Sequence, residues 1–521
     1  MALTSFWFLI FAAAVVLAYY LTPVKYRWVT LLIASYAFYA ISSIKTLIFM
    51  VATTVITFYG GRRLGQINAE HKAYLAEHKS ELSRDDKKEL KAKVQSRKKK
   101  VVAVILIFNF GVLAFLKYFR VYITALIPGI NLGILIPLGI SFYTFQAAAY
   151  IIDLYRVKYD ADDNIAKFGL FMSFFPQIIQ GPIARHDQLA AQLYEGHRFE
   201  YKNLTYGAQL ILWGFFKKLI IADRVAIMVS EVFDNPGDYQ GAIVFAALFG
   251  YTIQIYADFS GGIDIARGVA RTMGIEMSHN FMRPYFADRL SEFWRRWHMS
   301  LSFWTRDYIF YPISLSKTFG KLGKDMRSRV GDRVGKLFPV LCAQMATFVV
   351  IGIWHGAEFK YVAYGLYNAF IIILGLLLEP QLKAAVEKLH INAESRMWKV
   401  FQMLRTLMIV TIGRMFPKAA SFTVALSMYT SIFKGNGGVP FSEQILQLGL
   451  TGIDYCILLG ACAVWFVISF YQEKGIKIRD ALAEMNIVLR WVILILGVTA
   501  VLVAGIYGPG YDAAAFIYRG F

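Results

Sequence analysis

Long uninterrupted apolar runs are the feature that most constrains how this chain can fold. A helix needs about 20 apolar residues to cross roughly 30 Å of hydrocarbon. The runs are continuous rather than alternating, which favours membrane helices over the strands of a barrel. Twelve such runs lie at residues 4–21, 28–42, 45–60, 101–119, 134–152, 206–230, 242–265, 337–354, 361–378, 400–417, 450–470 and 489–508. The sequence therefore predicts an all-α, polytopic integral membrane helix bundle of about twelve transmembrane helices.

Charge is sparse and is concentrated between these runs. Only 17% of the residues are charged, against about 25% in soluble domains. Residues 61–100 hold thirteen Lys or Arg against six Asp or Glu, and residues 266–336 and 471–488 are also basic. Basic loops favour the cytoplasmic side, which predicts extracytoplasmic N- and C-termini. Basic loops beside anionic lipid also account for the net charge of +20, so nucleic-acid binding is not expected.

Two apolar segments do not read as simple crossings. Residues 168–183 are interrupted by Pro176, Gly181 and Pro182, and residues 284–316 mix Trp, Arg, His, Asp and Tyr. Irregular backbone at membrane depth is tolerated only where it lines a cavity or is buried in protein. Both segments are expected to be re-entrant or interfacial, within a bundle that has a polar interior.

These features divide the chain into five regions. The regions are N-terminal transmembrane helices (1–60), a basic cytoplasmic loop (61–100), the catalytic core (101–380), C-terminal transmembrane helices (381–488), and a final transmembrane helix with an external tail (489–521). The basic loop is expected to form an amphipathic helix or helix pair, and the catalytic core is expected to hold the residues of the reaction.

Polar residues within apolar surroundings are the candidates for chemistry. An ionisable side chain in a membrane helix costs about 2.5–3.5 kcal/mol on insertion scales and so needs a reason. Asp258, His298, Asp307 and His355 are the candidates. No HExxH motif or Cys/His cluster occurs, so a metal site is not expected.

His355 ends the uncharged run 337–354 and is followed by Gly356. Partial desolvation favours a neutral imidazole, which can accept a proton from an attacking hydroxyl. A histidine that only ties two helices together fits the position equally well. His298, in contrast, lies among arginines near the cytoplasmic side. It could bind an anionic donor or orient His355, but composition alone favours a side chain that faces the lipid headgroups.

Several blocks of sequence around these residues resemble the membrane-bound O-acyltransferase (MBOAT) family. The match is to the alginate O-acetyltransferase branch, with the teichoic acid D-alanyl transferase as a nearer cousin than the lipid or sterol enzymes. The ordered blocks span about residues 130–370. They are IPLGISFYTFQ (136–146), FFPQIIQGPI (174–183), QIYADFSGGID (254–264), NFMRPY (280–285), EFWRRWHMSLS (292–302), RDY (306–308) and GIWHG (352–356).

The resemblance implies an MBOAT-type fold with a central tunnel, in a bacterial cytoplasmic (inner) membrane. It implies that His355 is the catalytic histidine and that His298 occupies the family's second polar position. The donor would be acetyl-CoA or another acyl thioester that enters from the cytoplasm, with no tightly bound cofactor. The residues expected to bind substrate are Trp354, Asp258, Gln254, Arg295, Arg296, Arg306 and Asp307.

The last six residues, FIYRGF, resemble the Phe-x-Tyr-x-x-Phe ending of a small partner of the D-alanyl system. The resemblance implies that Tyr518 relays the acyl group outside the membrane; an aromatic anchor at the interface is the alternative. An extracytoplasmic SGNH-type or similar transferase, a polysaccharide acceptor and membrane lipid are the expected partners.

Three other functions fit the same pattern. Within the enzyme class, the alternative is D-alanyl transfer from a carrier protein to teichoic acid. A glycan or lipid transporter could use the polar interior to move an intact molecule. A scaffold for an extracytoplasmic transferase would lose function only when whole loops are removed.

Overall fold

The computed structural model describes residues 3–119, 122–123, 126–127, 135–435 and 438–507, and all regular elements in these ranges are helical. The predicted all-α class is therefore confirmed. The chain divides into two compact units, Met1–Thr205 with Val269–Ser278, and Tyr206–Gly268 with His279–Phe521. α10 and α12 have residues in both.

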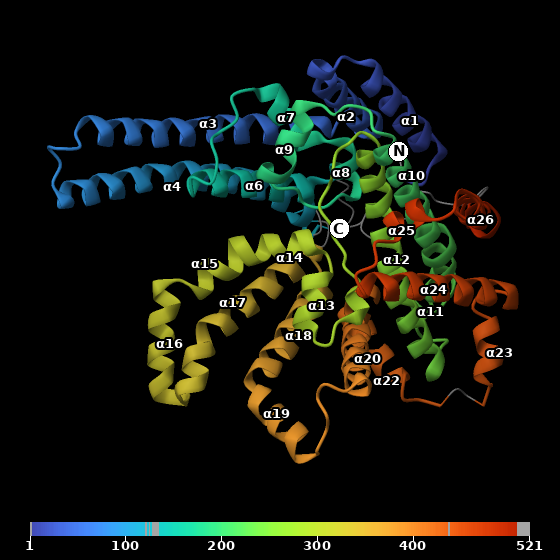
Figure 1. Cartoon of the computed structure of the whole chain (residues 1–521). Helices are drawn as coiled ribbons and strands as arrows, with labels where there is room; N and C mark the ends of the chain where they lie inside the picture. Colours follow the sequence, from blue (N-terminus) through green and yellow to red (C-terminus); the bar gives the residue numbers. More distant parts are fainter. Residues whose placement is uncertain (1–2, 120–121, 124–125, 128–134, 436–437, 508–521) are drawn as a thin grey trace. The chain divides into compact units, whose positions relative to one another are not determined.

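The first unit is built around a long antiparallel helix hairpin, α3 and α4, on which α6 packs (Figure 1). The expected boundaries of the basic region, after residues 60 and 100, fall inside α3 and α4. Lys, Glu, Ala and Leu are strong helix formers, so the helices continue where the charge pattern changes. The elements of this unit are α1 (Phe6–Leu21), η1 (Val24–Tyr26), α2 (Arg27–Ser43), α3 (Leu47–Glu77), α4 (Arg84–Ala114), η2 (Phe115–Phe119), α6 (Ile140–Tyr155), α7 (Ile165–Ser173), α8 (Phe175–Gln180) and α9 (His186–Glu195).

The segment 168–183 is broken as expected. α7 ends at Ser173, Phe174 leaves the helical conformation with ψ of 111°, and Pro176 stands in the first turn of α8. Proline is tolerated there because its missing N–H would have no helical partner. The broken stretch is buried within its unit.

The second unit holds every candidate site residue that the structure describes. Short helices, η4 to α15, replace a single crossing in 284–316, as expected. The elements are α10 (Tyr201–Phe215), η3 (Phe216–Ala222), α11 (Asp223–Asp234), α12 (Ala242–Thr272), η4 (Pro284–Phe286), α13 (Leu290–Arg296), α14 (Met299–Thr305), η5 (Arg306–Phe310), α15 (Tyr311–Ser314), α16 (Lys317–Val330), α17 (Asp332–His355), α18 (Phe359–Leu377), α19 (Glu379–Lys388), α20 (Arg396–Gly413), α21 (Met415–Lys418), α22 (Phe422–Ser431), α23 (Phe441–Leu446), α24 (Gly452–Glu473), α25 (Ile478–Glu484) and α26 (Ile487–Ala504).

Six helices of the described residues are long and apolar enough to cross a membrane, so twelve crossings stay a prediction. The six differ in how far their neighbours cover them: the apolar stretch of α12 is 67% buried, and that of α26 only 6%. They are Arg84–Phe119, Ala242–Thr272, Asp332–His355, Phe359–Leu377, Gly452–Glu473 and Ile487–Ala504.

The run 206–230 departs from the single regular helix expected there. A π-helical turn, η3, joins α10 to α11 and contains the buried Lys217 and Lys218. Lys218 Nζ lies 2.6 Å from Asp258 Oδ1 on α12, and Lys217 Nζ lies 2.8 Å from Asp264 Oδ2. The wider turn brings both ammonium groups to carboxylates of α12.

α17 and α18 form a tight antiparallel hairpin through two glycines. A Cβ on Gly365 would lie 2.3 Å from the carbonyl oxygen of Phe348, and one on Gly352 would lie 2.6 Å from that of Tyr361. Small residues let membrane helices approach this closely. The contact sets the position of the last turn of α17, where His355 lies.

We expect Gly365→Ala to separate these helices and lower the thermal stability of the detergent-solubilised protein. Overpacking of this kind costs about 1–3 kcal/mol. Gly375→Ala is the matched control on α18, because a Cβ there meets nothing within 4 Å. Alanine is a better helix former than glycine, so the control should be neutral or stabilising by up to about 1 kcal/mol. Equal melting temperatures for the two variants would contradict the prediction.

Candidate active site

His355 is the last residue of α17 and is only 7% exposed. Its ring centroid lies 4.8 Å from that of Trp354, 6.1 Å from that of Tyr364 and 6.4 Å from that of Tyr361. The chain turns directly into α18 through Gly356, where a Cβ would lie 2.3 Å from the ring of Tyr361. Position and aromatic neighbours together hold the imidazole at the start of a tight turn.

His298 lies at the junction of α13 and α14 in a left-handed conformation, with φ of 44°. Asn280 holds this turn: its Oδ1 accepts a hydrogen bond from the backbone N–H of Ser300 at 2.9 Å and lies 3.3 Å from His298 Nδ1. Left-handed conformations are uncommon outside glycine, although histidine is among the residues enriched in them, and they cluster at functional sites.

The expectation that His298 faces the headgroups is wrong. The residue is 1% exposed, because the aromatic rings of Phe259 and Trp354 pack edge-on against the imidazole at 4.9 and 5.8 Å. The composition-based placement failed because a charged neighbourhood in the sequence does not fix the surroundings of the side chain: Arg295 and Arg296 pair with Glu292 and Glu473. The Trp354 ring, packed against both imidazoles, instead joins His298 and His355 in one buried aromatic cluster.

Burial lowers the pKa of His298 to about 3. In the unfolded chain the imidazole of His298 would bind a proton near pH 6.5, whereas in the folded protein it stays neutral down to about pH 3. The folded protein therefore loses stability as the pH falls from about 6.5 towards 3. We expect the wild-type protein to lose up to about 1.4 kcal/mol per pH unit in this window through His298.

The measurement is the thermal unfolding midpoint of purified protein at pH values from 7.5 to 4.5. His298→Asn should flatten the acid limb of this curve, because an amide does not titrate. A curve for the variant that parallels the wild-type curve would show that His298 does not cause the acid sensitivity.

A small pocket opens beside His355, with a cavity volume of about 20 Å³. A buried water needs roughly 10–15 Å³ measured in this way, so the space suits a group the size of a hydroxyl rather than a whole sugar. Its lining is mostly aromatic, with two aliphatic residues, one imidazole and one guanidinium. The lining residues are Tyr251, Ile255, Trp294, Trp297, His355, Tyr364, Arg414 and Pro417.

Two predicted binding residues of α12 lie outside this lining. Asp258 is 2% exposed and forms an ion pair with Lys218, whose Nζ also lies 2.7 Å from Asp223. Gln254 stands one residue before Ile255, but its side chain is not part of the pocket wall. The structure therefore gives Asp258 a role in holding η3 against α12.

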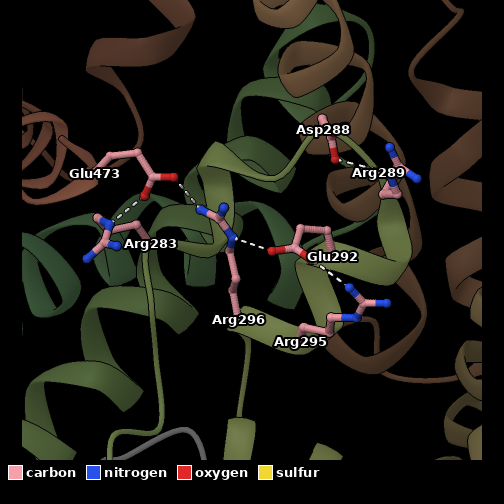
Figure 2. Close-up of polar contacts among 7 residues, drawn as sticks. All are labelled: Arg283, Asp288, Arg289, Glu292, Arg295, Arg296 and Glu473. Carbon is pink, nitrogen blue, oxygen red and sulfur yellow. Dashed lines mark hydrogen bonds and ion pairs between the residues drawn. The ribbon is translucent and has the colours of Figure 1, made fainter. Parts of the chain in front are cut away.

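Arg295 and Arg296, two of the arginines predicted to bind substrate, belong to an ion-pair network (Figure 2). Neither residue lines the pocket. Arg296 donates to Glu292 at 2.9 Å and to Glu473 at 2.8 Å, and Arg283 donates to the other oxygen of Glu473 at 2.6 Å. Arg295 is largely exposed and lies 3.3 Å from Glu292. The network ties α13 to the end of α24.

The pair Arg306 and Asp307 lies in η5 and is joined at 2.7 Å between Nε and Oδ1. The Arg306 guanidinium also lies 4.9 Å from the ring centroid of Phe303. Neither residue is part of the pocket lining. Tyr518, the proposed relay, falls outside the described residues.

Sequence reasoning missed two residues of this site. Asn280 belongs to the block NFMRPY, which resembles the family as a whole. The sequence alone could not show that the Asn280 side chain holds the turn at His298. Arg414 interrupts the apolar run 400–417, and the cost of a charge in such a run is the signal that would have found it.

Comparison with known proteins gives consistent matches. Residues 161–326 match the family model described as MBOAT, membrane-bound O-acyltransferase family. The chain is 31% identical over 464 residues to the probable alginate O-acetylase AlgI of Pseudomonas aeruginosa, covering 87% of this chain and 78% of that protein. It is 26% identical to the peptidoglycan O-acetyltransferase of Helicobacter pylori, covering 82% and 75%. It is 32% identical over 239 residues to the teichoic acid D-alanyltransferase of Bacillus subtilis, covering 45% and 58%.

Proposed function

The chain belongs to the membrane-bound O-acyltransferase family, and from this premise we propose that it transfers an acetyl group to a polysaccharide hydroxyl with His355 as general base. Membership establishes a multi-pass membrane protein and an O-acyltransferase. The donor, the direction of transfer and the acceptor are the finer parts of the proposal.

The observation that carries the proposal is His355 in the wall of a small aromatic pocket. A hydroxyl in this pocket would give its proton to the imidazole as its oxygen attacks the thioester carbonyl. The C–S bond then breaks, and the thiolate that leaves takes a proton back from the imidazolium. Such base catalysis contributes about 10²–10⁴-fold, and positioning in a water-poor pocket adds to it.

The donor we propose is cytoplasmic acetyl-CoA, and the acceptor a cell-surface or exported polysaccharide. The basic segments support a cytoplasmic donor, since basic loops favour that side. The two O-acetylating relatives that match most of the chain support acetyl transfer to a polysaccharide. Tyr518 would relay the acyl group outside, to an SGNH-type transferase or directly to the glycan.

D-alanyl transfer from a carrier protein is the second candidate, because the teichoic acid D-alanyltransferase match reaches 32% identity. That match covers 45% of this chain. The broader coverage of the O-acetylating relatives makes acetyl transfer the first candidate.

Incubation of the purified protein with radiolabelled acetyl-CoA tests both parts of the proposal. Label on Tyr518 that disappears in His355→Ala would support transfer through the tail. Label on added polysaccharide without label on the protein would replace the relay with direct transfer. If acetyl-CoA gives no transfer while a D-alanyl carrier protein does, the second candidate takes its place.

A further inference from the structure

α16 packs on the first turns of α17, one of the six helices long and apolar enough to cross a membrane (Figure 1). A Cβ on Gly323 of α16 would lie 2.8 Å from the carbonyl oxygen of Gly335 and 3.2 Å from Cδ of Pro339. The uncharged run of α17 begins at residue 337, so this contact falls where charged sequence changes to apolar sequence. Such a change marks the boundary between lipid headgroups and hydrocarbon. α16 therefore lies at the level of the headgroups.

One side of α16 is apolar and is only partly covered by α17. Phe319, Leu322, Met326 and Val330 recur at the spacing of a single helix face. Leu322 is 43% exposed and Val330 is 49% exposed, and Leu315, which precedes the helix, is 79% exposed. An apolar face left open beside a membrane-spanning helix suits contact with lipid.

Lys317, Lys321 and Lys324 form a second face of α16, here called the lysine stripe. Their spacing of four and then three residues places the three side chains on one side of the helix, opposite the apolar face. All three are exposed, and none of them forms an ion pair with a carboxylate in the part of the chain that the structure describes. Lys336, at the start of α17, instead meets Asp332 at 2.5 Å. The charge of the lysine stripe is thus not compensated within the described chain.

We propose that α16 is an interfacial helix whose lysine stripe binds the phosphate groups of anionic phospholipids, while its apolar face contacts the edge of the hydrocarbon. A basic amphipathic helix that directly precedes a membrane-spanning helix has this chemistry. α16 carries five Lys or Arg against one acidic residue, Asp325, which gives it a charge opposite to that of an anionic lipid surface.

Two features favour lipid over the phosphates of a soluble nucleotide. The lysine stripe extends for about 10 Å along the helix, which suits a row of separate headgroups better than one compact anion. A nucleotide bound to the lysines would also leave the apolar face exposed to water, whereas a membrane surface accommodates both faces. The inference involves neither the acyl donor nor the acceptor, so it stands or fails separately from the proposed function.

Hydrogen–deuterium exchange of the full-length protein in lipid nanodiscs tests the inference, because it reports on α16 separately from the other basic segments. The backbone amides of α16 should exchange about 10–100-fold more slowly in phosphatidylglycerol discs than in phosphatidylcholine discs, since each lysine near an anionic surface adds to binding. In about 1 M NaCl, where the Debye length falls to about 3 Å, most of this difference should disappear.

Two variants of the lysine stripe separate charge from folding. The triple variant Lys317→Gln, Lys321→Gln and Lys324→Gln should lose the difference between the two lipids. Its thermal midpoint in phosphatidylcholine discs should match that of the wild type, because the three side chains are exposed. Replacing the same three residues by arginine keeps the charge and should keep the difference.

The matched control removes three exposed lysines from the hairpin of α3 and α4. Lys72→Gln, Lys88→Gln and Lys91→Gln change the net charge by the same amount, at positions ten or more residues away from an apolar run. At about 1.5 Å of helix per residue this separation exceeds the Debye length at physiological salt. The control variant should show the wild-type difference in α16.

Four results would overturn the inference. The first is equal exchange of α16 in the two lipids, and the second is a difference that persists in the glutamine variant of the lysine stripe. The third is loss of the difference in the control variant as well, which would leave only an effect of net charge. The fourth is slower exchange of α16 on addition of acetyl-CoA to phosphatidylcholine discs, without any effect of phosphatidylglycerol, which would assign the lysine stripe to nucleotide phosphates.

Discussion

Replacing His355 by alanine should lower acyl transfer by about 10²–10⁴-fold, the usual contribution of a general base. The donor-binding surface and the helices remain, so the melting temperature should change far less than the rate. Transfer of label from radiolabelled acetyl-CoA to the acceptor, measured on purified protein at one pH, gives the comparison.

The control for this experiment is another histidine outside the pocket. His78, next to the end of α3, is half-buried, and its ring stacks on that of Tyr74. His78→Ala should transfer acetyl groups at the wild-type rate. If His355→Ala kept wild-type activity, the imidazole would be structural and another group would have to take the proton.

Removing the ammonium group of Lys218 should have the largest effect on stability. Lys218 and Asp258 are 1% and 2% exposed, so Lys218→Met leaves a buried carboxylate without its close cation. Breaking a buried pair from one side costs about 3–5 kcal/mol. We expect a marked fall in the thermal midpoint and in the yield of folded protein from membranes.

The triple variant Lys218→Met with Asp258→Asn and Asp223→Asn tests the cause. It removes the ammonium group together with both carboxylates that it meets and should recover most of the stability, because the penalty comes from the uncompensated ions and not from the missing side chain. Lys383→Met is the matched control: its ion pair with Glu379, at 2.8 Å, is exposed and contributes about 0–1 kcal/mol. Equal losses at both lysines would show that the buried pair adds nothing.

The helical class could be predicted, and His355 could be singled out as a candidate, because both depend on local pattern. An apolar run long enough to cross a bilayer can be recognised from hydropathy alone. A histidine at the end of such a run stands out because ionisable residues are costly there. The ion pairs of Lys217 and Lys218 join residues about forty positions apart along the chain. The hydropathy of one run does not show which distant carboxylates its lysines will meet. The π-helical turn η3, which brings Lys217 and Lys218 to these carboxylates, could therefore not be predicted.

The same limit applies to the arginines of 284–316. A count of cations says nothing about which carboxylate each one meets. Glu473 lies 177 positions after Arg296, and only the fold brings the two together. Arg414 shows the opposite situation. It is a single charge in an apolar run, and only the folded structure shows which groups surround it.

The low burial of α26 bears on how its sequence can drift. A helix with 6% of its apolar stretch covered by protein is selected for hydrophobicity and length, and hardly for shape. Exchanges among Leu, Ile, Val and Phe should therefore accumulate there almost freely over evolutionary time. In α12, which is 67% buried, the same exchanges would alter packing and be removed by selection. Among homologues, α26 should therefore diverge faster in sequence than α12, while its apolar composition stays the same.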